Sequence, residues 1–484
     1  MKKGRDEGER ERSIRPAHNR RSFILCLPPA SEVVKDSRSR FEVHTPAVKM
    51  PVGRLGPGML AALKKLAAEG GSETELARLV MKAEGASALP RFYFYLLDFD
   101  NRRLLCRRVC SDRRPLATSV PVSSGYKFET GGIDPRRRYV ISRFAFCRRA
   151  GEEIVIESPL SHARTILHDG RAMALLGELS RPCLPSALNA KACGLSERAA
   201  SLLLQLFSSA ALLSEVDDDG ESMEERDAAL SQWEFHDLLF HSRSRAGRHS
   251  NPYGGTNHLV GKVAPPAAIK PEMTGDSIDL YRPDIEMLLR TDVPLTKVIE
   301  DRRSRREHGR RSITGREMGE FLYRSARIRR VFSIDGYDFT DRVYPGGGAA
   351  YELELYLAVD RCKGVSAGLY HYDPFDHKLC RLSRKTRAVE QLLERAAKTA
   401  HATAPQVLII IAARFQRMSW RYESISYATI LKDVGVLYEA MYLVATAMGL
   451  SACALGGGDS DLFAEAAGTN YYLETSVGEF ILGR

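Results

Sequence analysis

The chain has 484 residues, of which 44% are hydrophobic and 27% are charged, values typical of globular proteins. This composition excludes a mainly disordered or collagen-like chain, and at ~150 residues per domain the length predicts about three domains. The 71 basic and 61 acidic residues give a formal charge of +10, which is modest for this length and does not by itself indicate nucleic-acid binding. Nine cysteines without a Cys-x-x-Cys pair favour reduced thiols over a disulfide scaffold or a zinc ribbon.

The chain shows no membrane or export signal. No apolar run approaches the ~18–20 residues that cross a bilayer. Residues 1–20 mix basic and acidic side chains and contain no apolar core of a secretory signal. We therefore expect a cytoplasmic protein without a membrane partner, and a disordered tail over residues 1–20.

The first half of the chain alternates helices with short strands. Three helical stretches precede a short hairpin near Cys106, which is the pattern of a winged helix. Residues 139–144 and 153–157 predict two further strands, paired around a polar turn, and more helices follow them. We therefore predict two winged-helix-like units, over residues 21–118 and 119–220.

A helix over 228–241 and a polar, aperiodic stretch predict a connector over residues 221–284. The last domain, 285–484, is predicted to be α+β, with a mixed sheet flanked by helices. The continuous apolar run 407–411 is typical of a central strand buried on both faces. The nearly all-apolar stretch 427–449 predicts a long helix buried in a large core or a subunit interface.

Three segments of the last domain suit an anionic or flat ligand. Planar guanidinium groups bind phosphate through parallel donors, and successive glycines let the backbone approach a ligand closely. The segments are the arginine-rich segment 302–306 (Arg-Arg-Ser-Arg-Arg), the first glycine loop 344–349 (Tyr-Pro-Gly-Gly-Gly-Ala) and the second glycine loop 455–459 (Leu-Gly-Gly-Gly-Asp). A solvated basic face, a nucleic-acid patch and flexible turns explain the same residues at this point.

Arg421 and Tyr422 place a cation beside a phenol between a predicted strand and a helix. Such a pair can exchange a proton with a substrate, and a structural cation–π contact would have the same sequence.

Histidines and aspartates on a predicted hairpin turn have the residue types of metal ligands, but aspartate also favours the turn itself. These residues are His371, Asp373, Asp376 and His377, and we expect no metal site. The chain has no P-loop, no Gly-x-Ser-x-Gly elbow and no Gly-x-Gly-x-x-Gly fingerprint, which argues against the corresponding nucleotide-hydrolysing, hydrolase and Rossmann classes.

Taken in order, these motifs resemble the flavin-dependent nitroreductase superfamily. More closely, they resemble its SagB-type branch, the azoline dehydrogenases of thiazole/oxazole-modified peptide biosynthesis. The arginine-rich segment is similar to the superfamily's Arg-Arg-Ser-x-Arg opening, and the first glycine loop to the branch's Tyr-Pro-Ser-x-Gly-Ala. Residues 368–374 resemble its Gly-Leu-Tyr-x-Tyr-Asp-Pro hairpin, 449–457 its Gly-Leu-x-Ala-Cys-x-x-Gly-Gly segment, and 482–484 its closing Val-Gly-Arg.

The resemblance implies an FMN enzyme that works as a homodimer, with flavins at the subunit interface. It implies that the arginine-rich segment holds the phosphate and the flavin's polar edge, that the second glycine loop lies against the ring, and that the first glycine loop comes from the partner subunit. The cofactor-binding residues that it implies are Arg302, Arg303, Ser304, Arg306, Pro345, Gly346, Gly347, Gly348, Gly456, Gly457 and Arg484.

Two positions depart from the branch pattern. Gly346 replaces a serine, so a side-chain hydrogen bond to FMN is lost there. Arg421-Tyr422 stands where the branch has Lys-Tyr, and arginine stays protonated where a lysine can become a base. The resemblance therefore implies that Tyr422 accepts a proton and that Arg421 stabilises the resulting anion or the substrate.

The expected function is FMN-dependent oxidation of thiazolines or oxazolines in a precursor peptide, with dioxygen as electron acceptor. The N-terminal units would bind the peptide's leader as an added strand, and a cyclodehydratase is a candidate partner. Two alternatives stay open: an NAD(P)H-dependent nitroreductase or enone reductase, and a winged-helix DNA-binding regulator with an inactive flavin domain. The predicted helix 74–82 offers only Arg78 and Lys82 to DNA, so we expect no nucleic-acid partner.

Overall fold

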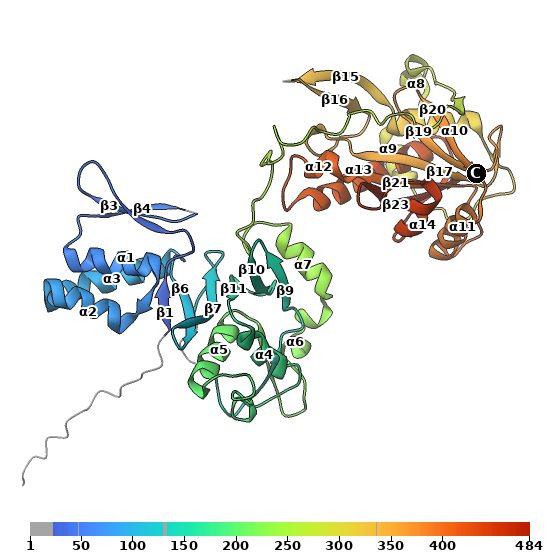
Figure 1. Cartoon of the computed structure of the whole chain (residues 1–484). Helices are drawn as coiled ribbons and strands as arrows, with labels where there is room; N and C mark the ends of the chain where they lie inside the picture. Colours follow the sequence, from blue (N-terminus) through green and yellow to red (C-terminus); the bar gives the residue numbers. More distant parts are fainter. Residues whose placement is uncertain (1–22, 47, 129–132, 335) are drawn as a thin grey trace, which may run out of the picture. The chain divides into compact units, whose positions relative to one another are not determined.

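The computed structural model describes residues 23–46, 48–128, 133–334 and 336–484. These residues form two compact units, Met1–Ser250 and Asn251–Arg484, and the boundary falls inside the predicted connector (Figure 1). Both units combine helices and strands, so the predicted α+β class is confirmed. The predicted tail over residues 1–20 lies outside the described residues.

Near its start, the first unit contains a small antiparallel sheet followed by three helices. The strands are β2 (Glu32–Lys35), β3 (Phe41–His44) and β4 (Lys49–Gly53). The helices are α1 (Pro57–Ala68), α2 (Glu73–Glu84) and α3 (Leu89–Asn101). The hydroxyl of Ser72 caps α2 by accepting the amide of Glu75 at 3.2 Å. Val43, Met59 and Phe92 share the buried core that joins the sheet to the helices.

A seven-stranded sheet runs through both halves of this unit. Its spatial order is β5 (Gly71–Ser72), β1 (Ile24–Cys26), β6 (Cys106–Ser111), β7 (Arg114–Pro121), β11 (Ala163–Leu167), β10 (Glu153–Glu157) and β9 (Phe146–Ala150). Helices α4 (Gly170–Glu178) and α5 (Glu197–Ser209) pack on it through residues such as Leu175 and Phe207. Strand β7 pairs with β6 on one side and β11 on the other, so the two predicted winged-helix-like units share one sheet.

The predicted pairing of strands 139–144 and 153–157 is wrong. Strand β8 (Arg138–Ile141) pairs with β12 (Leu213–Val216), and β10 pairs with β9 and β11 instead. The cause is the two-residue turn at Gly151 and Glu152, which joins β9 and β10 into a hairpin. Gly151 has a φ of +64°, which such tight turns require and which glycine adopts without strain.

The predicted helix 228–241 is interrupted. The structure has a short α6 (Met223–Arg226), a 3-10 turn at Leu230–Gln232, and α7 (Phe235–Arg243). The interruption lies at Trp233 and Glu234, whose backbones are extended, with ψ of 129° and 150°, so the helical hydrogen bonds cannot continue through them.

The second unit is built on another seven-stranded sheet. Its order is β13 (Ser277–Asp279), β20 (Lys378–Arg384), β19 (Gly368–Asp373), β17 (Leu353–Val359), β21 (Val407–Arg414), β23 (Glu474–Gly483) and β22 (Ser451–Leu455). Every neighbouring pair in it is antiparallel, whereas the sequence analysis predicts a mixed sheet. Sequence patterns give the burial of each strand but not its direction, which depends on long-range pairing. The parallel pair β14 (Ile313–Thr314) and β18 (Cys362–Lys363) lies apart from this sheet.

Helices cover both faces of this sheet. Alternate residues of the central strands, such as Leu357 and Ile409, face α10 (Gly315–Ala326) and α13 (Ser426–Ala447). Their neighbours, such as Tyr356 and Ile410, face α11 (Arg387–Ala400) and α14 (Ser460–Ala467). The predicted doubly buried strand and the predicted long helix are thus confirmed as β21 and α13.

The second unit also contains a hairpin and three short helices. The hairpin of β15 (Ile328–Ile334) and β16 (Tyr337–Arg342) extends from the second unit (Figure 1). Helix α12 (Phe415–Ser419) follows β21, and α8 (Ile285–Thr291) and α9 (Leu295–Asp301) precede the arginine-rich segment. Within the described part of the chain, no helix has the length and hydrophobicity that crossing a membrane requires.

Candidate active site

The arginine-rich segment runs between the edge strand β22 and helix α13. The amide of Arg305 donates to the carbonyl of Ala452 at 2.9 Å. The hydroxyls of Ser304 and Tyr442 lie 3.0 Å apart, and the Arg302 guanidinium lies 5.4 Å from the centroid of the Tyr442 ring. These contacts fix the backbone of the segment while leaving Ser304 and most of its arginine side chains exposed to solvent.

The arginines of this segment differ in what they contact. The Arg303 guanidinium donates to the carbonyls of Glu300 and Arg302, each at 2.7 Å, so it holds its own segment together. Arg306 is exposed and Arg302 is half-buried. Arg302 and Arg306 are therefore better placed than Arg303 to bind a phosphate.

The C-terminus lies beside this segment. The carbonyl of Arg484 accepts the amide of Gly309 at 2.5 Å. The Arg484 guanidinium forms an ion pair with Glu317 at 3.0 Å. The structure therefore brings Arg484 to the arginine-rich segment, as the resemblance implies, but its charge is partly neutralised by Glu317.

A cavity of about 420 Å³ lies between the second glycine loop, α13 and β23. Leu431, Val434 and Tyr438 line it on the helix side, and Gly456 and Gly457 on the loop side. A Cβ at either glycine would have no atom within 4 Å, so the loop backbone borders open space. A surface without side chains admits the close approach of a flat ring.

Glu479, in β23, lines the same cavity, and the sequence analysis did not identify it. Its side chain is buried, and burial raises the pKa of its carboxyl. A Cβ on Gly458 would lie 1.9 Å from its Oε1, so the loop passes directly over the carboxyl. A lone acidic residue before the apolar run 480–482 is the sequence signal that could have found it.

The first glycine loop is held by helix α13. The amide of Gly347 donates to both carboxylate oxygens of Asp433, at 3.0 and 2.9 Å. Gly348 has a φ of +59°, and a Cβ there would lie 2.1 Å from the Tyr422 hydroxyl. The loop therefore needs glycine at this position, both for its conformation and for the approach of Tyr422.

A pair of buried carboxyls lies beneath this loop. Glu352 is fully buried, and neither of its carboxyl oxygens has a hydrogen-bond partner among the described residues. Burial and the neighbouring Asp433 carboxylate raise the pKa of Glu352 to about 8. Glu352 is therefore protonated at neutral pH, and Asp433 carries the charge that binds the Gly347 amide. Asp433, one of two acids in the largely apolar helix α13, was missed by the sequence analysis.

Arg421 and Tyr422 follow α12 and lie beside the same loop. The Arg421 guanidinium carbon lies 5.7 Å from the centroid of the Tyr422 ring. The Arg421 carbonyl accepts the amide of Asn257 at 3.0 Å, and the Tyr422 carbonyl accepts the Ser426 hydroxyl at 2.5 Å. The backbone of the pair is thus fixed on both sides, while the Tyr422 hydroxyl faces Gly348.

The predicted site residues therefore form two groups along α13. The first glycine loop, Arg421 and Tyr422 gather near Asp433, and the arginine-rich segment gathers near Tyr442. At 1.5 Å per residue, these two positions of the helix are about 13 Å apart. The cavity over the second glycine loop lies between them, along Val434 and Tyr438.

The histidines and aspartates of the predicted hairpin, which have the residue types of metal ligands, make hydrogen bonds and ion pairs within the fold. His371 contacts Glu354 at 3.1 Å. Burial raises the pKa of Glu354, but the contact with His371 outweighs burial and lowers this pKa to about 2. Asp373 accepts the amides of Phe375 and Asp376 in the turn, and His377 lies 2.9 Å from the Tyr372 hydroxyl. Among the described residues, no three histidine, cysteine or acidic side chains are grouped as a metal site.

Three protein-family models match successive parts of the chain. They are the ThcOx helix-turn-helix domain over residues 20–130, the cyanobactin oxidase ThcOx over 139–250 and the nitroreductase family over 299–484. The nitroreductase-family protein MJ1384 of Methanocaldococcus jannaschii is 30% identical over 186 residues, which are 38% of this chain and 85% of that protein. The chain belongs to the nitroreductase family of oxidoreductases.

The order of the three models confirms, within that family, the resemblance to the SagB-type branch. The trifolitoxin-processing protein TfxB of Rhizobium leguminosarum is 24% identical over 166 residues, which are 34% of this chain and less than half, 44%, of that protein. A chain of the Escherichia coli microcin synthetase McbBCD, solved with truncated pro-MccB17 bound, is similar with a TM-score of 0.32 and 18% identity, over 47% of this chain and 81% of that one.

Proposed function

We propose that this protein is an FMN-dependent azoline oxidase, which dehydrogenates thiazolines or oxazolines of a precursor peptide to thiazoles or oxazoles. The observation that supports this best is the Tyr422 hydroxyl held against Gly348, with Arg421 beside it. Together with the match to a cyanobactin-oxidase model, this arrangement supports Tyr422 as a proton acceptor beside the first glycine loop.

The donor set and the glycine surface fit FMN. Arg302, Ser304 and Arg306 offer donors for the phosphate, and the Arg484 carbonyl accepts the amide of Gly309, three residues after Arg306. Gly456 and Gly457 leave open space where the flat ring would lie. FMN, when bound, supplies the two-electron acceptor that no side chain offers.

We propose that the working form is a homodimer. Several large apolar side chains of α8 and α9 are exposed, among them Leu289 at 76% and Leu295 at 64%. Tyr472, before β23, is 79% exposed. A second copy of the chain would cover such surfaces, and it would bring its first glycine loop to the cavity that this chain's own loop does not line.

The protein's part in the reaction is proton handling and positioning. Aromatisation of an azoline removes a proton from one ring carbon and a hydride from the next. The phenolate form of Tyr422 is the proposed proton acceptor and becomes the neutral phenol in the step, and the Arg421 guanidinium stabilises negative charge on the phenolate or on the substrate ring. Dioxygen is the proposed final acceptor of the two electrons, which gives hydrogen peroxide.

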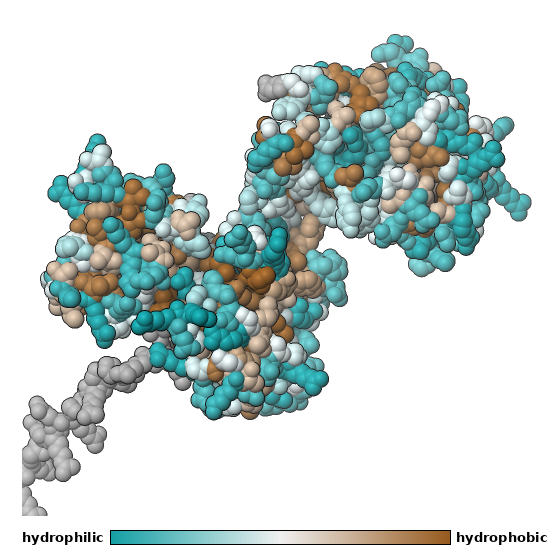
Figure 2. All heavy atoms as spheres, in the orientation of Figure 1, coloured by the Kyte–Doolittle hydropathy of each residue, from teal (hydrophilic) through white to brown (hydrophobic). Residues whose placement is uncertain are grey.

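The first unit is proposed to bind the leader of the precursor peptide, in the cytoplasm where that peptide is made. Strands β2 and β4 form the two edges of the small sheet, and such edges accept an added strand. Helix α3 contacts β4 through the Tyr95 hydroxyl, 2.5 Å from the Val52 carbonyl. On the same helix Phe94 and Leu97 are 64% and 63% exposed, and Figure 2 shows apolar surface over α1–α3.

A single purification tests the class and the reaction. The protein should be yellow, release FMN on denaturation and elute as a dimer. Incubation with an azoline-bearing peptide in air should give a mass loss of two hydrogens per ring, together with peroxide. A colourless protein that binds no added FMN, or a flavoprotein that leaves azoline peptides unchanged, would contradict the proposal.

Leader binding is tested by removing the first unit. A chain that begins at Asn251 contains both cores of the second unit, so it should retain FMN. Its affinity for a fluorescent leader peptide, measured by anisotropy, should be lost. Equal leader affinity with and without the first unit would refute this assignment.

An NAD(P)H-dependent reductase is the second candidate, favoured by the 30% identity to a protein named as a nitroreductase. Rapid reduction of bound FMN by NADH or NADPH, monitored by the loss of flavin absorbance, would favour it. Reduction by an azoline peptide alone would favour the oxidase.

A further inference from the structure

A second cavity, of about 640 Å³, lies in the second unit, and of the predicted cofactor-binding residues Gly348 lines it. We call it the hairpin cavity, because the β15–β16 hairpin forms one of its walls. Its volume lies within the ~300–1,000 Å³ typical of ligand sites. It shares no lining residue with the cavity over the second glycine loop, so the two are separate sites of one chain.

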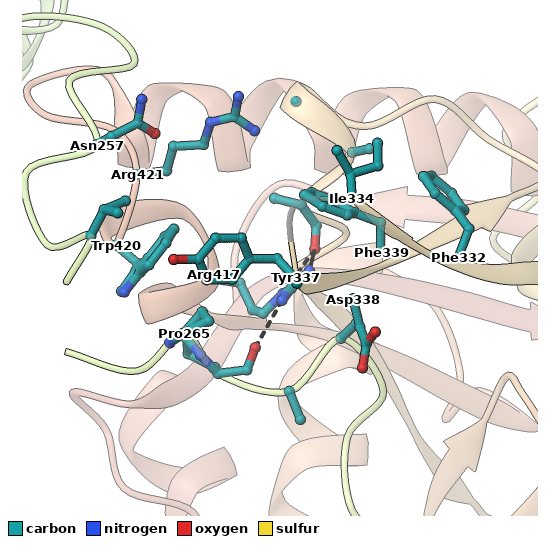
Figure 3. A pocket seen from close by; sticks show the side chains of 18 residues that line it. Asn257, Pro265, Phe332, Ile334, Tyr337, Asp338, Phe339, Arg417, Trp420 and Arg421 are labelled. Carbon is teal, nitrogen blue, oxygen red and sulfur yellow. Dashed lines mark hydrogen bonds between the residues drawn. The ribbon is translucent and has the colours of Figure 1, made fainter.

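One wall of the hairpin cavity is apolar. Phe332 and Ile334 project from the same face of β15, and Phe339 is the cross-strand partner of Phe332. The rings of Phe332 and Phe339 are stacked, with centroids 5.8 Å apart. Figure 3 shows these three side chains together along one side of the cavity. Ile334 is 53% exposed, so an apolar ligand would remove it from water.

The opposite wall is a stretch of connector fixed to α12 and the residues after it. The indole of Trp420 donates to the Val263 carbonyl at 2.7 Å, and the Arg417 guanidinium donates to the Pro266 carbonyl at 2.8 Å. Arg417 also donates to the Ala350 carbonyl, at 2.7 and 3.0 Å, directly after the first glycine loop. These hydrogen bonds fix the connector wall of the cavity against α12 and the first glycine loop.

The cavity adjoins the proposed chemistry. Gly348 and Arg421 both line it, and the Tyr422 hydroxyl lies against Gly348. Among the described residues, the Arg421 guanidinium forms no hydrogen bond or ion pair, so its donors are available to a ligand carbonyl. Figure 3 shows Arg421 and Asn257 on the side away from Phe332 and Phe339.

We propose that the hairpin cavity binds an apolar or aromatic side chain of the substrate peptide, from the residue next to the oxidised ring. This inference rests on the proposed function and adds its substrate preference. The apolar wall takes the side chain, and Arg421 and Asn257 bind peptide carbonyl or amide groups beside it. A free anion fits less well, because the carboxylate of Asp338 also lines the cavity.

The test uses the full-length, FMN-loaded protein and two azoline peptides that differ only in the residue next to the ring, phenylalanine or glycine. We expect kcat/KM to be at least tenfold higher for the phenylalanine peptide, a preference of the size that an apolar pocket gives. Ile334→Asp, which places a charge in the apolar wall, should abolish the preference. Val331→Asp is the matched control, since Val331 lies on the other face of β15 and is 40% exposed; it should retain the preference. Equal kcat/KM for both peptides, or an intact preference in Ile334→Asp, would overturn the proposal.

A binding measurement separates this inference from the proposed function. Trp420 is one of two tryptophans in the chain, so in a Trp233→Phe background its emission reports on the cavity alone. Titration with the oxidised, azole-bearing phenylalanine peptide should change this emission, with a Kd at least tenfold weaker in Ile334→Asp. If emission responds but no azoline peptide is oxidised, the proposed function fails and the peptide site stands. If the emission does not change and no peptide is oxidised, both the peptide site and the proposed function are refuted. If the peptide is oxidised without any emission change, only the peptide site is refuted.

Discussion

The buried carboxyl of Glu352 predicts that the second unit loses stability as the pH rises. Its pKa lies near 8 in the folded protein, against 4.5 for an exposed glutamate. The folded state therefore holds a proton that the unfolded state releases above about pH 4.5. The stabilising effect of this proton is complete below pH 4.5, falls as the pH rises, and is gone above about pH 8. At ~1.36 kcal/mol per pKa unit, the loss is at most about 5 kcal/mol.

The comparison of wild type with Glu352→Gln isolates this effect. Glutamine has nearly the same shape and cannot ionise, so the variant should lose less stability between pH 5 and pH 9. The free energy of unfolding is measured with urea, followed by Trp420 emission in a Trp233→Phe background so that only the second unit is observed. Titrating groups that do not interact with Glu352 are common to both proteins and cancel in the difference, whereas the coupling of Glu352 to Asp433 is part of the effect that is measured.

Parallel pH dependences of the unfolding free energy in the two proteins would refute this reasoning, because Glu352 would then titrate normally.

A second readout concerns the first glycine loop. Ionised Glu352 repels the Asp433 carboxylate that binds the Gly347 amide, so the loop should open to solvent above pH 8. Amide hydrogen exchange of residues 346–349, corrected for its intrinsic rise with pH, should therefore increase in the wild type and not in the glutamine variant.

Three further predictions concern the cofactor and the chemistry. Arg302→Ala should weaken FMN binding at least tenfold in a fluorescence titration, because a charged phosphate contact is lost; unchanged affinity would place the phosphate elsewhere. Gly457→Val should abolish FMN binding without lowering the apoprotein's melting temperature, since a side chain there meets open space; a variant that still turns yellow would contradict the ring site. Tyr422→Phe should keep the flavin but lower kcat at least a hundredfold, the size of a lost acid–base group; an unchanged kcat measured with the azoline peptide would exclude Tyr422 as the proton acceptor.

The parts of the site that the sequence predicted are those with local signals. Consecutive arginines and glycines mark the ligand segments without knowledge of the fold, and the apolar period marks α13 and β21. Asp433 and Glu352 have no such signal. Other acids stand near them in the sequence, Glu439 and Glu354, and only the packing of the first glycine loop distinguishes the two that matter. The hairpin cavity was missed for the same reason, since its walls come from an aperiodic connector and a distant hairpin.

Pairings between distant strands were likewise beyond local reasoning. Strand β8 pairs with β12, which lies more than seventy residues further along the chain. The sequence of neither strand indicates which strand it pairs with. The predicted boundary between residues 118 and 119 also falls inside β7, because turn and helix signals do not reveal that one strand serves two halves of a sheet.

That shared strand has a practical consequence for anyone dissecting the protein. Cutting the backbone at Thr118 would leave two fragments, each with a frayed half of β7 and an unsatisfied row of amides, and both would be prone to aggregate. The two halves of the first unit should therefore be expressed together and unfold as one cooperative block. A single mutation in β7 should weaken both at once.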